Sequence, residues 1–245
     1  MGKIDPIAPA LFPPDSVSAG FTDRSGGFSS RPYASLNLGG ATADDPETVQ
    51  RNRQLLYNHL QVPESSVALM GQVHGSSILR VDTGGLYAAV DGLLTDTPGI
   101  LLGVLVADCV PLLLYDPEHR AAAAIHCGWR SITGGIVEHA VVRMHDLFGT
   151  VPERVRAATG PGAGVCCYEI GPEIAAKLHP SAAVRKNDCW HADLKAEIMS
   201  RLWDSEILES HMYINPDCTI CNTRYFSHRR EKGITGRMMG YILLK

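Results

Sequence analysis

The sequence lacks the features that mark membrane, secreted and nucleic-acid-binding proteins. No apolar run approaches the 18 or so residues of a transmembrane helix. The formal net charge of −4 provides no basic excess for nucleic acid or an anionic membrane. The first 15 residues contain four prolines and no apolar segment of signal-peptide length. We therefore expect a cytoplasmic protein whose partner is a small molecule, with no nucleic acid and no membrane involved.

The familiar catalytic motifs are also missing. The chain has no P-loop, no GxGxxG, no HExxH and no GxSxG nucleophile turn. The HxE…PCxxC pattern of cytidine-type deaminases is absent. Copper sites rely on several histidines, and no HxH pair occurs here. These absences exclude the common motif-defined enzyme classes as first hypotheses.

Cysteine is present but in an arrangement that does not suit disulfides. The count is seven, and Cys166 and Cys167 are adjacent. An odd count with a vicinal pair suits a reducing compartment, so we expect thiols. One CxxC runs from Cys218 to Cys221 between two histidines. With His211 and His228 it could in principle bind zinc, but without a second CxxC we favour free thiols in a strand and turn region.

With 245 residues and 45% hydrophobic content, the chain can bury a sizeable core. We expect one α+β domain over residues 1–245, with mixed β-sheets flanked by helices and an irregular lead-in over residues 1–15. Apolar periodicity and helix-start signals predict helices over residues 46–60, 134–148, 172–178 and 191–210. Strands are predicted from Val17, over residues 66–72, 77–81, 92–94, 101–107, 121–125 and 155–160, and in the tail segments YIN, TRYFSHRR and GYILL.

Residues 101–135 hold the main functional candidates. Residues 101–107 and 121–125 are nearly continuous apolar runs, which indicate strands buried on both faces. The runs stop next to Cys109 and at His126, two residues that can bind a metal or act in catalysis. Side chains at strand ends are well placed to project into a site.

His74, Cys109 and His126 could supply the three protein ligands of a catalytic zinc site, which leaves one position open for water or substrate. They are 35 and 17 residues apart, which is not a local zinc signature. In the alternative interpretation, Cys109 is a buried core thiol and both histidines are ordinary hydrogen-bonded residues. The spacing alone leaves both interpretations open.

Three neighbouring features favour a functional site. Asp108 follows an apolar strand, where a carboxylate is costly to bury unless it is paired or hydrogen-bonded. His74 lies in the segment QVHG, whose glycine allows close approach of the backbone to a ligand. Downstream of His126, residues 128–130 combine a glycine, a tryptophan and an arginine. They could offer open backbone, an aromatic wall and a fixed cation.

Arginine is a second source of candidates, because its forked guanidinium suits phosphate. Four arginines crowd the tail, but Glu231 lies among them and pairing or solvation is the favoured interpretation. These residues are Arg224, Arg229, Arg230 and Arg237. Arg53 and Arg130 are better anion candidates because they fall near the segments described above.

Seven ordered segments together resemble one family. They are GFTDRSGGFSSRPYASLNLG, NRQLL, QVHG, VADCVPLLLYDP, AAIHCGWRSITGGI, TGPGAGVCCYEIG and FSHRREKGITGRMMGYI. From about residue 17 to the C-terminus, the chain resembles the family once labelled multicopper polyphenol oxidase or laccase domain proteins. Its bacterial members are described as purine nucleoside phosphorylases with adenosine deaminase activity. The resemblance implies an α+β fold and zinc, with copper as the other metal, on His74, Cys109 and His126.

The resemblance also implies a reaction. The enzyme would cleave adenosine, inosine or methylthioadenosine with phosphate and would deaminate adenosine, so its partners would be a purine nucleoside and phosphate. By position in the matching segments, Asn37 and Gln72 would contact the nucleoside, and Arg53 and Arg130 the phosphate or ribose. Asp108 would orient a ligand or carry a proton, with a structural role as the alternative.

The chain departs from the family pattern in two places. The usual HAGWRG appears as HCGWRS, and Cys221 is an addition. We expect Cys127 and Ser131 to lie beside the metal, where they would affect substrate preference.

Three other functions remain as alternatives. Cys109 as a low-pKa thiolate would make the protein a cysteine hydrolase. Some bacterial relatives are linked to peptidoglycan precursor editing, a reaction that would suit a cysteine- or zinc-dependent hydrolase. A copper-dependent polyphenol oxidase and a non-enzymatic binding module complete the set.

Overall fold

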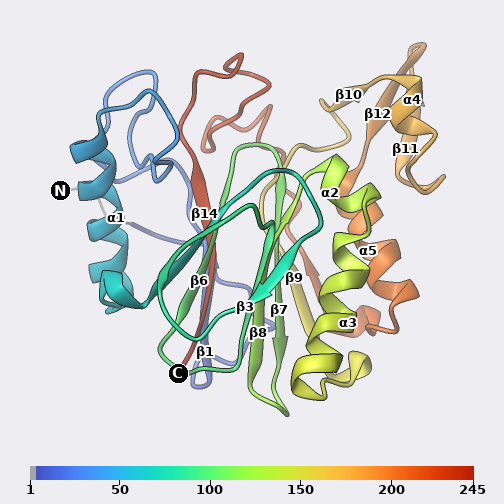
Figure 1. Cartoon of the computed structure of the whole chain (residues 1–245). Helices are drawn as coiled ribbons and strands as arrows, with labels where there is room; N and C mark the ends of the chain where they lie inside the picture. The colour runs from blue at the N-terminus through green and yellow to red at the C-terminus, as the bar shows by residue number, and fades with distance from the viewer. Residues whose placement is uncertain (1–3) are drawn as a thin grey trace.

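The computed structural model describes residues 4–245 and contains two large β-sheets packed face to face, with helices on both outer sides (Figure 1). The five-stranded sheet has the order β1 (Val17–Phe21), β14 (Met238–Leu244), β6 (Leu101–Val106), β2 (Val67–Gly71) and β4 (Gly85–Ala88). The six-stranded sheet has the order β13 (Met212–Ile214), β9 (Arg156–Thr159), β7 (Val110–Asp116), β8 (Ala121–Cys127), β5 (Gly92–Thr95) and β3 (Ile78–Arg80). Both sheets contain parallel and antiparallel pairs, which confirms the predicted single α+β domain with mixed sheets.

One long helix covers the five-stranded sheet and two cover the six-stranded sheet (Figure 1). Helix α1 (Pro46–Leu60) begins where predicted, because the Asp45 carboxylate accepts the N–H of Thr48 and proline occupies the first turn. On the opposite side lie α2 (Trp129–Thr133), α3 (Ile136–Phe148) and α5 (Leu194–Asp204). A small sheet of β10 (Glu169–Ile170), β12 (Cys189–Ala192) and β11 (Ala183–Lys186) accompanies α4 (Pro172–Ala175). Single 3₁₀ turns lie at Glu64–Ser66, Pro152–Arg154 and Glu209–His211.

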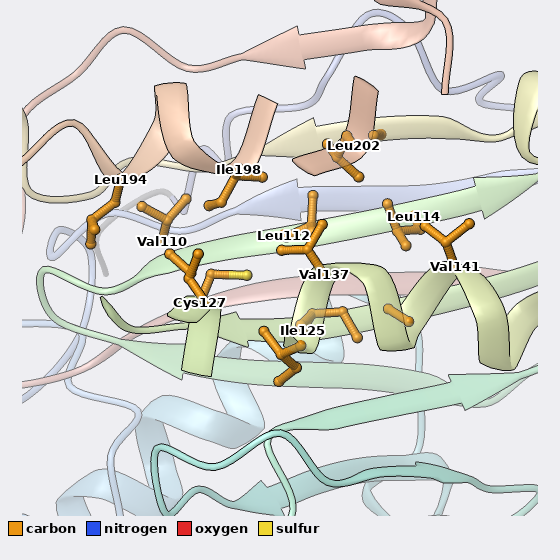
Figure 2. Packing of buried hydrophobic residues seen from close by; sticks show 14 of the residues in the cluster. Val110, Leu112, Leu114, Ile125, Cys127, Val137, Val141, Leu194, Ile198 and Leu202 are labelled. Atoms are coloured by element: carbon orange, nitrogen blue, oxygen red, sulfur yellow. The ribbon is translucent and has the colours of Figure 1, made fainter. Parts of the chain in front are cut away.

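Strand alternation on the central strands builds two layers of core at once. On β7, Leu112 and Leu114 face α3 and α5, whereas Leu113 and Tyr115 face the other sheet. Figure 2 shows the helix-facing layer, in which side chains of β7 and β8 meet those of α3 and α5. Residues 121–124 of β8 are all alanine and fully buried, so their small side chains occupy little of the space in either layer. None of the helices in residues 4–245 is long and apolar enough to cross a membrane.

Several predicted elements need correction. Residues 110–116 form the central strand β7, which is missing from the predicted strands. The helix predicted over residues 191–210 covers only α5, because β12 extends to Ala192 and the Asp193 carboxylate caps the helix by accepting two backbone N–H groups. The segment TRYFSHRR forms turns instead of a strand. There the Arg230 guanidinium donates hydrogen bonds to backbone carbonyls, including those of Thr219 and Tyr225, so these carbonyls have partners without forming a β-sheet.

The predicted lead-in precedes β1. Its first residues, 1–3, lie outside the described residues. From residue 4 to β1 the chain contains no helix and only one isolated bridge, between Ile7 and Phe21.

Candidate metal centre and cleft

Three candidate ligands meet where strands of both sheets end. His74 lies in the turn after β2 with φ of 59°, Cys109 lies in the connection from β6 to β7, and His126 lies near the end of β8. One ligand atom of each residue lies within 4.8 Å of the others. The connection that carries Cys109 passes from one sheet to the other, which brings donors from distant segments together.

Alternation along β8 orients His126 and its neighbour differently. His126 shares a face with Ala122 and Ala124, which pack toward the other sheet, so its ring reaches the cleft. Cys127 points the opposite way and packs in the apolar layer under the helices (Figure 2). Ser131 is fully buried in α2 and does not line the cleft. The prediction that these two residues flank the metal is therefore wrong, because neither side chain faces it.

A buried aspartate positions both histidines. Asp91 Oδ1 lies 2.7 Å from His126 Nδ1 and accepts the backbone N–H of His74 at 3.0 Å. Oδ2 accepts the N–H groups of Val73 and Gly75, at 3.2 and 2.7 Å. Burial would raise the pKa of Asp91, but these hydrogen bonds and the His126 ring hold it below its ordinary value. A carboxylate on Nδ1 leaves the other ring nitrogen of His126 for a metal ion.

No sequence pattern singles out Asp91. It precedes Gly92, and an aspartate followed by glycine is typical of a turn. The usable signal is that a carboxylate stands directly before a buried strand, the same argument that pointed to Asp108.

The thiol and the imidazole at the centre perturb each other. Burial opposes charge on Cys109, but His126 and His74 lower the pKa of its thiol to about 6. Burial likewise opposes charge on His126, while Cys109 and Asp91 raise the pKa of its imidazole to about 9. The pair therefore favours a thiolate near neutral pH, and thiolate is the form that binds metals and acts as a nucleophile.

The residues fit a metal ion in both chemistry and space. Two imidazoles and one thiolate are a donor set that zinc accepts, and three protein ligands leave a further position open. Gly128 lies directly beside the donors. A Cβ there would come within 2.8 Å of His74 Nδ1 and 3.2 Å of Cys109 Sγ, so only glycine leaves both ligands undisturbed.

Asp108 supports the same region in a different way. Its φ of 84° bends the chain between β6 and β7. Its carboxylate accepts hydrogen bonds from the Thr219 hydroxyl and the backbone N–H of Arg229, both at 2.6 Å. Its backbone carbonyl accepts one from the N–H of Ala163. Asp108 therefore ties three segments together and also lines the cleft.

A cleft of about 840 Å³ opens in front of the candidate ligands. Trp129 and Tyr168 provide aromatic walls, and Gly39 and Gly40 leave part of the wall without side chains. Its positive charge comes from Arg53, Arg130, Arg229 and Arg237. A cavity of this size takes a drug-sized organic molecule, and the arginines favour one that carries or accompanies an anion.

The four residues predicted to contact substrate differ in how many of their polar side-chain atoms already form hydrogen bonds within the protein. Arg53 donates through Nε to the carbonyl of Leu38, and within residues 4–245 its other nitrogens have no hydrogen-bond partner. The Arg130 guanidinium has no hydrogen bond to the described residues and stacks on Trp129, with its Cζ 4.3 Å from the ring centroid. Gln72 lines the cleft, but its amide bonds both backbone groups of Leu105.

Asn37 does not line the cleft. It is fully buried, and its amide donates to Thr42 and Asp44 and accepts from the N–H groups of Gly39 and Arg237. It supports the glycine-containing wall from behind.

The tail arginines divide into two pairs. Arg224 pairs with Asp23 at 2.7 Å and Arg230 with Glu231 at 2.9 Å, in agreement with the structural role favoured from the sequence. Arg229 and Arg237 instead line the cleft. Nothing in their sequence context distinguishes these two, because only the fold turns them toward the cleft.

Three donors of this kind, in a cleft whose arginines form no ion pair within residues 4–245, are typical of proteins that use a metal ion for catalysis. The chain belongs to the multi-copper polyphenol oxidoreductase laccase family, whose model matches residues 18–245. This confirms the resemblance found in the sequence.

Individual relatives are similar over nearly the whole chain. A Streptomyces coelicolor protein named purine nucleoside phosphorylase is 40% identical over 235 residues, which cover 92% of this chain and 94% of that protein. Purine nucleoside phosphorylase YlmD of Geobacillus stearothermophilus is 34% identical over 243 residues, which cover 91% of this chain and 89% of that protein. The crystal structure of YlmD from the same organism has a TM-score of 0.92 at 33% identity, covering 97% of this chain and 94% of that one.

Proposed function

We propose that this chain is a zinc-dependent purine nucleoside phosphorylase for adenosine, inosine or methylthioadenosine, and that it also deaminates adenosine. The observation that carries the proposal is the convergence of His74, Cys109 and His126 in a cleft whose arginines form no ion pair with the described residues. The relatives named purine nucleoside phosphorylases support the substrate class.

The metal would be held by His74, Cys109 and His126, with Asp91 fixing the orientation of the His126 ring. Bound zinc supplies a Lewis acid and lowers the pKa of a neighbouring water, which is the chemistry that deamination at purine C6 needs. Gly128 keeps the space beside the donors clear.

Phosphorolysis requires an anion held beside the sugar. A phosphate oxygen bonds to C1′ of the ribose as the bond from C1′ to the purine nitrogen breaks, and the electron pair leaves with the base. Arg53 and Arg130 hold the phosphate or the ribose in this proposal, because both guanidinium groups have donors to spare. Asp108 supplies the carboxylate of the cleft lining. Its two oxygens already accept hydrogen bonds from the Thr219 hydroxyl and the backbone N–H of Arg229.

The leaving purine needs an aromatic surface and a proton. Trp129 and Tyr168 line the cleft and offer faces on which a purine can stack. His228 lines the same cleft and offers an imidazole that can donate a proton to the departing base. Asp108 is the alternative proton carrier.

The experiment is an incubation of purified, zinc-analysed protein with adenosine, with and without phosphate. We expect adenine and ribose 1-phosphate only when phosphate is present, and inosine in both arms. Cys109→Ala should lose both products together with the zinc of the cleft site, whereas Cys189→Ser, at a cysteine outside the cleft, should keep them. Zinc-loaded protein that forms neither product would refute the proposal.

One observation favours a second candidate function. Asp91, His126 and Cys109 are arranged as an aspartate, a histidine and a low-pKa thiol, the order found in cysteine hydrolases. Such a hydrolase would cleave an amide, for example in a peptidoglycan precursor. Metal-free protein that hydrolyses a muropeptide and loses this activity on alkylation of Cys109 would establish it. The same metal analysis, with a phenol as substrate, tests copper-dependent oxidation.

A further inference from the structure

A second cluster of metal-binding side chains lies outside the His74, Cys109 and His126 group. Cys166 and Cys167 lie between β9 and β10, and Cys218 and Cys221 lie between β13 and β14. The four Sγ atoms all lie within 4.8 Å of one another, and those of Cys166 and Cys221 are 3.8 Å apart. The CxxC that lacked a partner in the sequence therefore gains the vicinal pair from another loop.

The spacing of the sulfurs matches one metal ion. Tetrahedral zinc binds thiolates at about 2.3 Å, which places the sulfurs about 3.8 Å from one another. The pair Cys166 and Cys221 already has this separation, and the remaining sulfurs need to move by less than about 1 Å. A disulfide would require the two sulfurs to approach to about 2.05 Å and would leave the other two cysteines unused.

The surroundings of the cluster suit a thiolate site. The N–H of Gly164 donates to Cys218 Sγ at 3.2 Å, and the N–H groups of Ile220 and Cys221 also point to this sulfur. Four thiolates around one zinc ion carry a net charge of −2. The ammonium of Lys195, only 6% exposed, is held nearby by the carbonyls of Asn215 and Asp217, and its charge opposes that excess.

We propose that Cys166, Cys167, Cys218 and Cys221 bind a single structural zinc ion that fastens these two loops to each other. Four protein ligands close the coordination sphere, so the site holds the fold and leaves no position for substrate. Each thiol gives its proton to solvent as zinc binds.

The fastened loops form part of the wall of the cleft. Tyr168, next to Cys167, lines the cleft, and Thr219, next to Cys218, donates to the Asp108 carboxylate. The loops already touch through the bridge between Gly162 and Cys218. Zinc in the cysteine cluster therefore stabilises the supports of the cleft and takes no part in the reaction.

The test counts zinc per chain in full-length protein purified under reducing conditions. Cys221→Ser should lose one equivalent of zinc relative to the unchanged protein, since an exposed ligand is removed without disturbing the core. Cys109→Ala should keep that equivalent, and Cys189→Ser is the matched control that keeps all zinc. If the cleft binds no zinc, the unchanged protein will contain a single equivalent, which Cys221→Ser removes and Cys109→Ala leaves in place.

Cobalt provides a second measurement that does not depend on zinc counting. Cobalt(II) in a tetrahedral thiolate site absorbs intensely in the visible range, and we expect this spectrum in Cys109→Ala but not in Cys109→Ala combined with Cys221→Ser. Zinc content that Cys221→Ser leaves unchanged, or a mass two hydrogens lighter from a disulfide between Cys166 and Cys221, would overturn the proposal.

Discussion

Replacement of Asp91 by asparagine tests whether the buried carboxylate controls metal binding. The change keeps the size of the side chain but removes its charge and converts one oxygen into an NH₂ group. Oδ1 serves His126 and the N–H of His74, and Oδ2 serves the N–H groups of Val73 and Gly75. Whichever oxygen is replaced, two donors then face a group that cannot accept.

The size of the effect follows from these bonds. Hydrogen bonds to a charged group contribute about 1.5–3 kcal/mol each, so two lost bonds correspond to about 3–6 kcal/mol before the turn relaxes. Asp91 is fully buried, so water cannot replace the lost acceptor without rearrangement. Carboxylates that orient metal-binding histidines typically change metal affinity by about 10–100-fold. We expect the affinity of the cleft site for zinc to fall by that factor, together with a lower melting temperature of the protein.

Zinc affinity would be measured by competition with a coloured chelator, and melting temperature by calorimetry on the same samples. Asp96→Asn is the matched control, because Asp96 is a partly exposed aspartate that directly follows β5, as Asp91 directly precedes it, and pairs with Arg80. It should change neither quantity by a comparable amount. Asp91→Asn with unchanged zinc affinity would show that the carboxylate does not orient the ligands and would refute the reasoning.

Three further predictions concern the same cleft. Gly128→Ala should abolish zinc binding at the cleft, because its Cβ would lie 2.8 Å from a ligand nitrogen, whereas Gly75→Ala, whose Cβ meets nothing closer than 3.5 Å, should retain the cleft zinc in the same measurement. In zinc-stripped protein, alkylation of Cys109 by iodoacetamide should rise with pH around 6, because neighbouring imidazoles depress the pKa of its thiol; a midpoint near 9 would contradict this. Arg53→Gln and Arg130→Gln should each raise the KM for phosphate about tenfold or more, since a charge-assisted hydrogen bond contributes about 1.5–3 kcal/mol. An unchanged KM in both variants would place phosphate elsewhere.

The elements that could be predicted from sequence are those with local signals. Helix α1 begins at a capping aspartate followed by proline, and α3 ends at Gly149, whose φ of 73° suits glycine. Strand β7 has no such signal at its start, because residues 101–116 are almost continuously apolar apart from the turn at Asp108. Only hydrogen-bonded pairing with β8 and β9 divides the run into two strands that belong to different sheets.

The candidate site divides in the same way. His74, Cys109 and His126 could be proposed from their chemistry, but the family resemblance was needed to join them, since no local spacing connects them. The position of Asp91 between two of them depends on the contact of β5 with β8, which brings Asp91 to His126 across 35 residues. The cysteine cluster likewise combines residues about 50 apart that no sequence window contains.

The passage of the chain from one sheet to the other between β6 and β7 has a consequence for the order of assembly. Cys109 belongs to this crossing, while His74 follows a strand of the first sheet and His126 belongs to the second. Neither sheet alone contains all three donors, so a metal ion added to a refolding chain finds no complete site until the sheets have docked. Metal uptake at the cleft should therefore follow docking of the sheets, and the rate of that docking should not depend on zinc concentration, even though the final stability does.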